Sequence, residues 1–72
     1  MTDIRLEKFR NAQGLRQLAR ERRDPALYRK AAEIFRKIDW IANAEYCEEE
    51  AERLDYYFNY LRTAQVSYRN AG

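Results

Sequence analysis

The chain has 72 residues, so it forms one domain at most and can bury only a modest core. One cysteine and no histidine exclude an internal disulfide and the usual mixed Cys/His zinc sites. The net charge of +2 conceals a split, because residues 1–38 carry eleven Lys/Arg against five Asp/Glu, and residues 39–72 carry three against seven. We expect the two halves to pack together and neutralise each other; the alternative is two separate charged docking surfaces.

The composition favours helix, since Ala, Leu, Glu, Arg and Lys are abundant beside two glycines and one proline. We expect a single all-α domain over residues 1–72, either a small three-helix bundle or a helical hairpin followed by a long C-terminal helix. No apolar run approaches the roughly 20 residues of a membrane span, and the charged start does not resemble a signal peptide. With one unpaired thiol, the protein is expected to be cytoplasmic.

The first predicted helix covers residues 3–23. Its end is marked by the stretch RRDPALY, in which Asp24 is a suitable N-cap and Pro25 a suitable first residue for the next helix. Gly14 lies inside the helix and disfavours it, so we expect a kink or break there. The predicted apolar face has Phe9 at its border, excludes Leu6, and comprises Ile4, Ala12, Leu15, Leu18 and Ala19.

The second predicted helix covers residues 25–39 and has the clearest amphipathic pattern. Its broad apolar stripe is flanked by Tyr28 and comprises Leu27, Ala31, Ile34, Phe35, Ile38 and Ile41. Trp40 falls opposite this stripe. A turn at Asp39 would fold Trp40 back into the core, where single tryptophans of small domains usually lie; otherwise Trp40 is an exposed anchor on a basic face.

The third predicted helix covers residues 43–69 and begins near Asp39 or Asn43, both of which are acceptable N-caps. Apolar positions then recur at alternating steps of three and four, which indicates a coiled-coil-like seam. The seam comprises Ala44, Cys47, Ala51, Leu54, Phe58, Leu61, Gln65 and Tyr68. We expect Cys47 to be buried as a small hydrophobic residue.

The stretch YRKAAEIFRKID, residues 28–39, resembles the second helix of a tetratricopeptide (TPR) repeat. The family's Tyr, small and aromatic positions correspond to Tyr28, Ala31 and Phe35, and its first-helix positions to Leu15, Leu18 and Ala19. The chain departs from the pattern at Arg22, Ile38 and Asn43, where the family has an aromatic residue, alanine and proline. The resemblance covers one repeat, whereas repeat folds need about three. It implies a helical hairpin that serves as a scaffold for protein–protein contact.

Nothing in the sequence indicates an enzyme. Histidine, the commonest general acid or base, is absent, and no glycine-rich phosphate loop is present. Because Glu45, Glu49 and Glu52 lie opposite the seam, we interpret them as a solvated helix face rather than a metal site. We therefore expect no catalytic residue, no metal site and no cofactor.

A second face of the third helix is the predicted partner-binding surface. Tyr46, Arg53, Tyr56 and Tyr60 fall in line opposite the seam, and Tyr and Arg are enriched at interface hot spots. Arg53 could stack on a neighbouring tyrosine ring. With Trp40 as a further contact, these residues predict a non-enzymatic interaction module, such as an adaptor, a chaperone-like binder or an inhibitor of a larger assembly. We expect a homodimer or a larger complex, and an accessory protein of phage or plasmid type fits this description.

The alternative function is nucleic-acid binding through the basic side chains of the first two helices. The predicted contacts to phosphates are Arg16, Arg20, Arg23, Arg29, Arg36 and Lys37. A helix-turn-helix motif does not account for them, because Arg22, Asp24 and Arg29 stand where that motif requires apolar residues. The acidic cluster of the third helix also opposes this function unless it faces away from the ligand.

Overall fold

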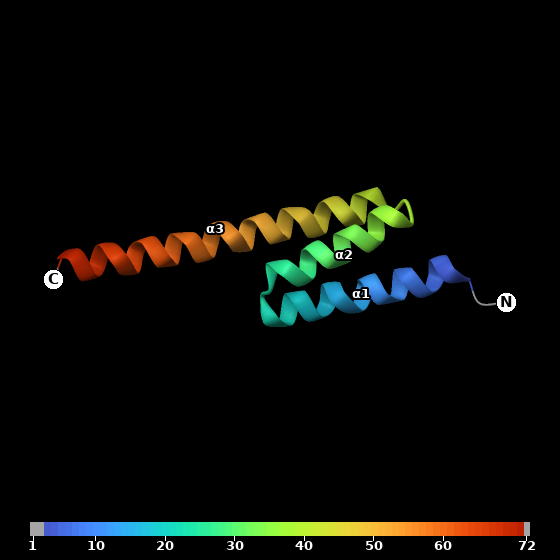
Figure 1. Cartoon of the computed structure of the whole chain (residues 1–72), viewed down its shortest axis with the longest axis horizontal. Coiled ribbons are helices and arrows are strands. Elements are labelled where there is room, and N and C mark those ends of the chain that lie inside the picture. Colours follow the sequence, from blue (N-terminus) through green and yellow to red (C-terminus); the bar gives the residue numbers. More distant parts are fainter. Residues whose placement is uncertain (1–2, 72) are drawn as a thin grey trace.

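The computed structural model describes the backbone of residues 3–71 and the side chains of residues 3–64. It contains three helices: α1 (Ile4–Arg22), α2 (Pro25–Lys37) and α3 (Ile41–Ala71) (Figure 1). No strand occurs between residues 3 and 71, which confirms the all-α prediction. The observed helix ends lie within two residues of the predicted ones.

The three helices form a flat, elongated array with α2 in the middle. α2 packs against α1 on one side and against α3 on the other, and the chain measures 64 × 18 × 11 Å (Figure 1). α3 runs well past the start of α2, so its C-terminal part has no neighbouring helix in the chain (Figure 1). The fold is thus the predicted helical hairpin followed by a long C-terminal helix, rather than a closed bundle.

The turn between α1 and α2 follows the local sequence signals. The backbone of Arg23 is left-handed, with φ of 51°, and the N–H of Asp24 donates to the carbonyl of Ala19 at 3.0 Å. This ends α1 in an αL turn. The carboxylate of Asp24 then accepts a hydrogen bond from the N–H of Ala26 at 2.9 Å, with Pro25 as the first residue of α2.

The turn between α2 and α3 differs from the prediction. Asp39 adopts φ of 67° and the N–H of Trp40 donates to the Phe35 carbonyl at 2.8 Å, which is the Schellman arrangement at the end of α2. α3 begins immediately afterwards, and the Trp40 carbonyl accepts from the N–H of Ala44 at 3.1 Å. Neither Asp39 nor Asn43 is therefore the N-cap of α3, and Ile41 is an exposed first residue of α3 rather than part of the α2 stripe.

The core consists mainly of small side chains, which allow the helices to approach closely. Phe35 is its largest fully buried side chain, and the ring of Phe9 makes a T-shaped contact with it at a centroid distance of 5.9 Å. Tyr28, predicted to flank the stripe, is buried, as is the unpredicted Ala32. The buried residues are Ala12, Ala19, Tyr28, Ala31, Ala32, Phe35, Ile38, Ala44, Cys47 and Ala51.

Two expectations for the first helix are wrong. Ile4, placed on the apolar face, is 65% exposed because it lies in the first turn of α1, outside the buried cluster. α1 also continues through Gly14 without a break. An added Cβ at Gly14 would meet no atom within 4 Å, so the glycine serves no packing purpose here. The buried positions Tyr28, Ala31 and Phe35 suit any helical hairpin, and the TPR resemblance stays a prediction.

Candidate interaction surfaces

One flank of the α2–α3 contact is held by ion pairs. Arg36 donates two hydrogen bonds to Glu48, at 2.7 and 2.8 Å, and Arg29 pairs with Asp55. The hydrogen bonds from Arg36 lower the pKa of Glu48, and the same contact raises the pKa of Arg36. These pairs join the basic half of the chain to its acidic half, as the charge distribution predicted.

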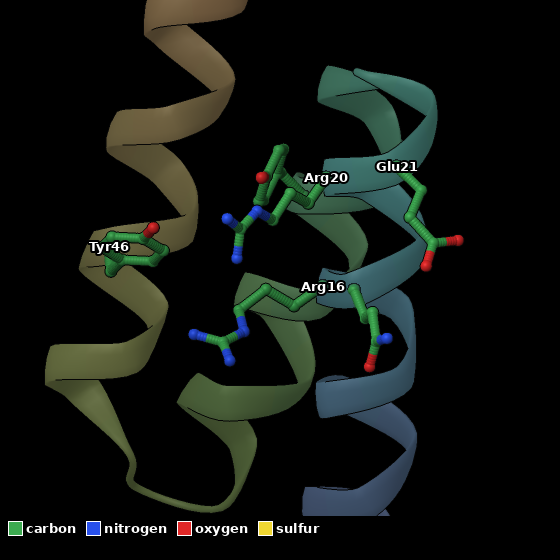
Figure 2. A pocket seen from close by; sticks show the side chains of 6 residues that line it. Arg16, Arg20, Glu21 and Tyr46 are labelled. Carbon is green, nitrogen blue, oxygen red and sulfur yellow. The ribbon is translucent and has the colours of Figure 1, made fainter.

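The opposite flank of the same contact is a hollow of about 470 Å³ to which all three helices contribute. Arg16 and Arg20 extend from α1 towards Tyr46 on α3, whereas Glu21 points away (Figure 2). The guanidinium carbon of Arg16 lies 5.9 Å from the centroid of the Tyr46 ring, a cation–π distance. The hollow is lined by Arg16, Gln17, Arg20, Glu21, Tyr28 and Tyr46.

The two arginines of the hollow form no ion pair with a described side chain. Among the described side chains, no carboxylate lies within 4 Å of Arg16 or Arg20. Glu50 is engaged with Arg53 at 2.9 Å. The pKa of Tyr28 is raised, first by burial and then by the charge of Glu50, so its phenol stays protonated and can donate.

The helical geometry of α3 separates the two flanks. Successive residues differ by about 100° around a helix axis, so Tyr46 and Glu48 lie on opposite sides of the buried Cys47. Burial also raises the pKa of the Cys47 thiol, which is therefore a protonated core side chain rather than a nucleophile.

The six predicted phosphate contacts are consequently divided. Arg16 and Arg20 line the hollow, whereas Arg29 and Arg36 are engaged with carboxylates on the other flank. The remaining two also lie elsewhere. Arg23 forms the turn after α1, and Lys37 lies 3.9 Å from the carboxylate of Glu33. The structure therefore does not bring the six together into one basic surface.

The C-terminal half of α3 is the largest uncovered element. From Tyr56 onwards every residue with a described side chain is exposed, and we call residues 56–71 the projecting half of α3. The predicted seam is buried only as far as Ala51 and half-buried at Leu54; Phe58 is 43% and Leu61 39% exposed. Neither α1 nor α2 extends along this part of α3 (Figure 1). The side chains of Gln65 and Tyr68, the last predicted seam positions, lie outside the described residues.

Seam and back face merge into one surface on the projecting half. Successive residues are about 100° apart around the helix axis, so Tyr56 and Phe58 mark the two edges of an apolar surface that covers roughly 200° of the helix circumference. The other apolar side chains of residues 56–64 lie between these edges. The whole apolar set is Tyr56, Tyr57, Phe58, Tyr60, Leu61 and Ala64. Asn59, Arg62 and Thr63 form the narrower polar strip opposite, and Arg62 is the single charged residue in 56–64. Tyr56 and Tyr60 are 76% and 63% exposed.

The predicted partner-binding residues do not form one surface. Tyr46 faces Arg16 across the hollow, and Arg53 pairs with Glu50 instead of stacking on a tyrosine. Only Tyr56 and Tyr60 belong to the projecting half. Trp40 lies at the α2–α3 turn, where its ring is tilted against that of Phe9 at a centroid distance of 4.7 Å and remains 47% exposed. It is thus neither fully buried nor a free anchor.

Sequence reasoning missed two features of the site. Phe58 and Leu61 are exposed because α3 is much longer than α2. The predicted helix ranges, 25–39 and 43–69, already differed in length in this way. The second feature is the hydrogen bond from Arg5 to the carbonyl of Ile38 at 2.7 Å, which ties the start of α1 to the end of α2. No local sequence pattern predicts that contact.

Comparison with protein-family models, curated proteins and solved structures finds no match to this chain. Between residues 3 and 71, no helix has both the length and the apolar character needed to cross a membrane. Within the same described part, no three His, Cys, Asp or Glu side chains come together as a group able to hold a metal ion.

Proposed function

We propose that this protein is a non-enzymatic protein–protein interaction module that works as a homodimer through the projecting half of α3. The observation that carries the proposal is the apolar seam, which continues at helical spacing beyond the last residue that α2 covers. An isolated helical segment of about 16 residues is marginal in water, so a partner would also stabilise it.

The chemistry of the projecting half suits a protein interface. Charged residues make up 36% of the whole chain but only one of the nine residues 56–64. Depletion of charge together with enrichment of tyrosine and phenylalanine is the composition of interface centres. A nucleic-acid surface would require the opposite composition.

A second copy of the chain is the occupant that this surface fits best. Two projecting halves bring little charge towards each other: within residues 56–64 each contributes one charged side chain, Arg62, and the sequence adds Arg69 nearer the C-terminus. In an antiparallel pair related by a two-fold axis, the seam residues Leu54, Phe58 and Leu61 of one copy would pack against the seam of the other. The two helical hairpins would then lie at opposite ends of the dimer.

The size of the surface sets the expected affinity. The partly exposed aromatic side chains would bury on the order of 500 Å² per copy, which is near the lower limit for a specific interface. We therefore expect a dimer that dissociates at micromolar concentration. Its hairpins remain free to act as an adaptor, a chaperone-like binder or an inhibitor within a larger assembly.

The test is analytical ultracentrifugation from about 1 to 500 µM, a range that brackets micromolar dissociation. The wild type should shift from monomer to dimer, and Phe58→Ala/Leu61→Ala should remain monomeric with its helicity nearly unchanged. Asn59→Ala/Thr63→Ala alters the polar strip of the same turns and should still dimerise. A wild type that is monomeric throughout, or a Phe58/Leu61 variant that dimerises normally, would refute the proposal.

A further inference from the structure

We propose that the hollow between α1, α2 and α3 is a binding site for the phosphate group of a small aromatic phosphate ester. Arg16 and Arg20 stand one helical turn apart on α1 and both reach into the hollow (Figure 2). Guanidinium groups bind phosphate oxygens through paired, charge-assisted hydrogen bonds. The site is independent of the projecting half of α3, so either proposal can fail without the other.

The opposite flank of the protein shows why the ligand should carry more charge than a carboxylate. There, the single guanidinium of Arg36 satisfies the carboxylate of Glu48 with two hydrogen bonds, at 2.7 and 2.8 Å. In the hollow, two guanidiniums share a space into which no described carboxylate extends within 4 Å of them. A phosphate monoester supplies about −1.5 to −2 charges at pH 7 and three acceptor oxygens, which match two such groups.

The other walls of the hollow favour an aromatic ester. The ring of Tyr46 is about half exposed and already holds Arg16 at a cation–π distance, so a planar group can be added beside it. The buried Tyr28 on α2 contributes a protonated phenol, whose pKa is raised by burial. The volume of about 470 Å³ falls within the usual range for small-molecule sites.

Two acidic groups lie around the hollow, and neither pairs with Arg16 or Arg20. Glu21 also lines it but points away from the two arginines (Figure 2). Glu50, whose charge acts on Tyr28, is held by Arg53 at 2.9 Å. Arg16 and Arg20 are thus the charged side chains that extend into the hollow, while Glu50 acts on Tyr28 from beside it.

The experiment is a titration with phenyl phosphate at low salt, followed by the NMR signals of the Tyr46 ring and the arginine side chains. We expect saturable shifts at Tyr46, Arg16 and Arg20. Arg16→Gln/Arg20→Gln should weaken binding by about tenfold or more, because the variant loses the charge-assisted hydrogen bonds that both guanidinium groups donate to the phosphate. The matched control, Arg10→Gln/Arg22→Gln, removes two exposed charges from the same helix outside the hollow and should bind normally.

Three further ligands separate the sources of binding. Inorganic phosphate should bind more weakly than phenyl phosphate, because it lacks the ring, and benzoate should bind more weakly still. Equal binding of benzoate, or equal loss in both double variants, would overturn the phosphate site. A short single-stranded oligonucleotide that binds more tightly than phenyl phosphate, and whose binding also requires Arg29 and Lys37, would overturn it in favour of a nucleic-acid surface.

Discussion

Replacement of Phe35 by alanine should unfold this protein at room temperature. Phe35 is the largest fully buried side chain in a core made mostly of alanines, and the ring of Phe9 makes a T-shaped contact with it. Truncating a buried phenylalanine costs about 3–5 kcal/mol, which includes the cavity that the small neighbours cannot fill. A single core in a chain of this length rarely supplies more than about 3–5 kcal/mol in total.

The matched control is the same substitution on the projecting half, Phe58→Ala. Phe58 is 43% exposed and is not one of the buried residues of the core, so its loss should cost about 1 kcal/mol or less in the monomer. The assay is urea unfolding followed by circular dichroism at low micromolar concentration, where the proposed dimer is dissociated. At high concentration Phe58→Ala should lose additional stability relative to the wild type, because dimer formation stabilises only the wild type.

Two results would refute this reasoning. If Phe35→Ala retains a cooperative transition with more than half of the wild-type stability, the small-residue core is not organised around this ring. If Phe58→Ala is as destabilising as Phe35→Ala in the monomer, the projecting half is covered by the rest of the chain, contrary to its exposure.

Two further predictions concern the helices and the ion pairs. Gly14→Ala should stabilise the protein by about 1 kcal/mol in urea unfolding, because the site is helical and the new methyl group meets no atom within 4 Å. A neutral or unfavourable effect would show that α1 is distorted at Gly14. Arg36 holds the pKa of Glu48 below its unfolded value, so this pair stabilises the fold above about pH 4.3, and its contribution is lost as the pH falls through the folded-state pKa. The difference in melting temperature between wild type and Arg36→Gln should accordingly shrink in acid, and a difference that stays constant from neutral to acid pH would contradict it.

The sequence by itself determined the helices and their order. Pro25 after Asp24 set the boundary between α1 and α2, and the spacing of Leu27, Ala31 and Phe35 marked the buried stripe. These signals are local: caps, fixed backbone angles and helical periodicity act between residues at most a few positions apart. The opposite charges of the two halves also predicted that the halves would pack together, although not that α2 would be the helix that pairs with α3 or which residues would meet.

Only the tertiary structure decided which faces are covered. The heptad pattern is regular through Leu54, Phe58 and Leu61, yet burial stops near Leu54, because a residue is buried by a partner helix rather than by its own periodicity. Likewise Tyr46 is far in the chain from Arg16 and Arg20, and it meets them only because α2 holds α1 and α3 at its two sides. Contacts between distant residues depend on relative helix lengths and packing angles, and these are properties of the whole fold.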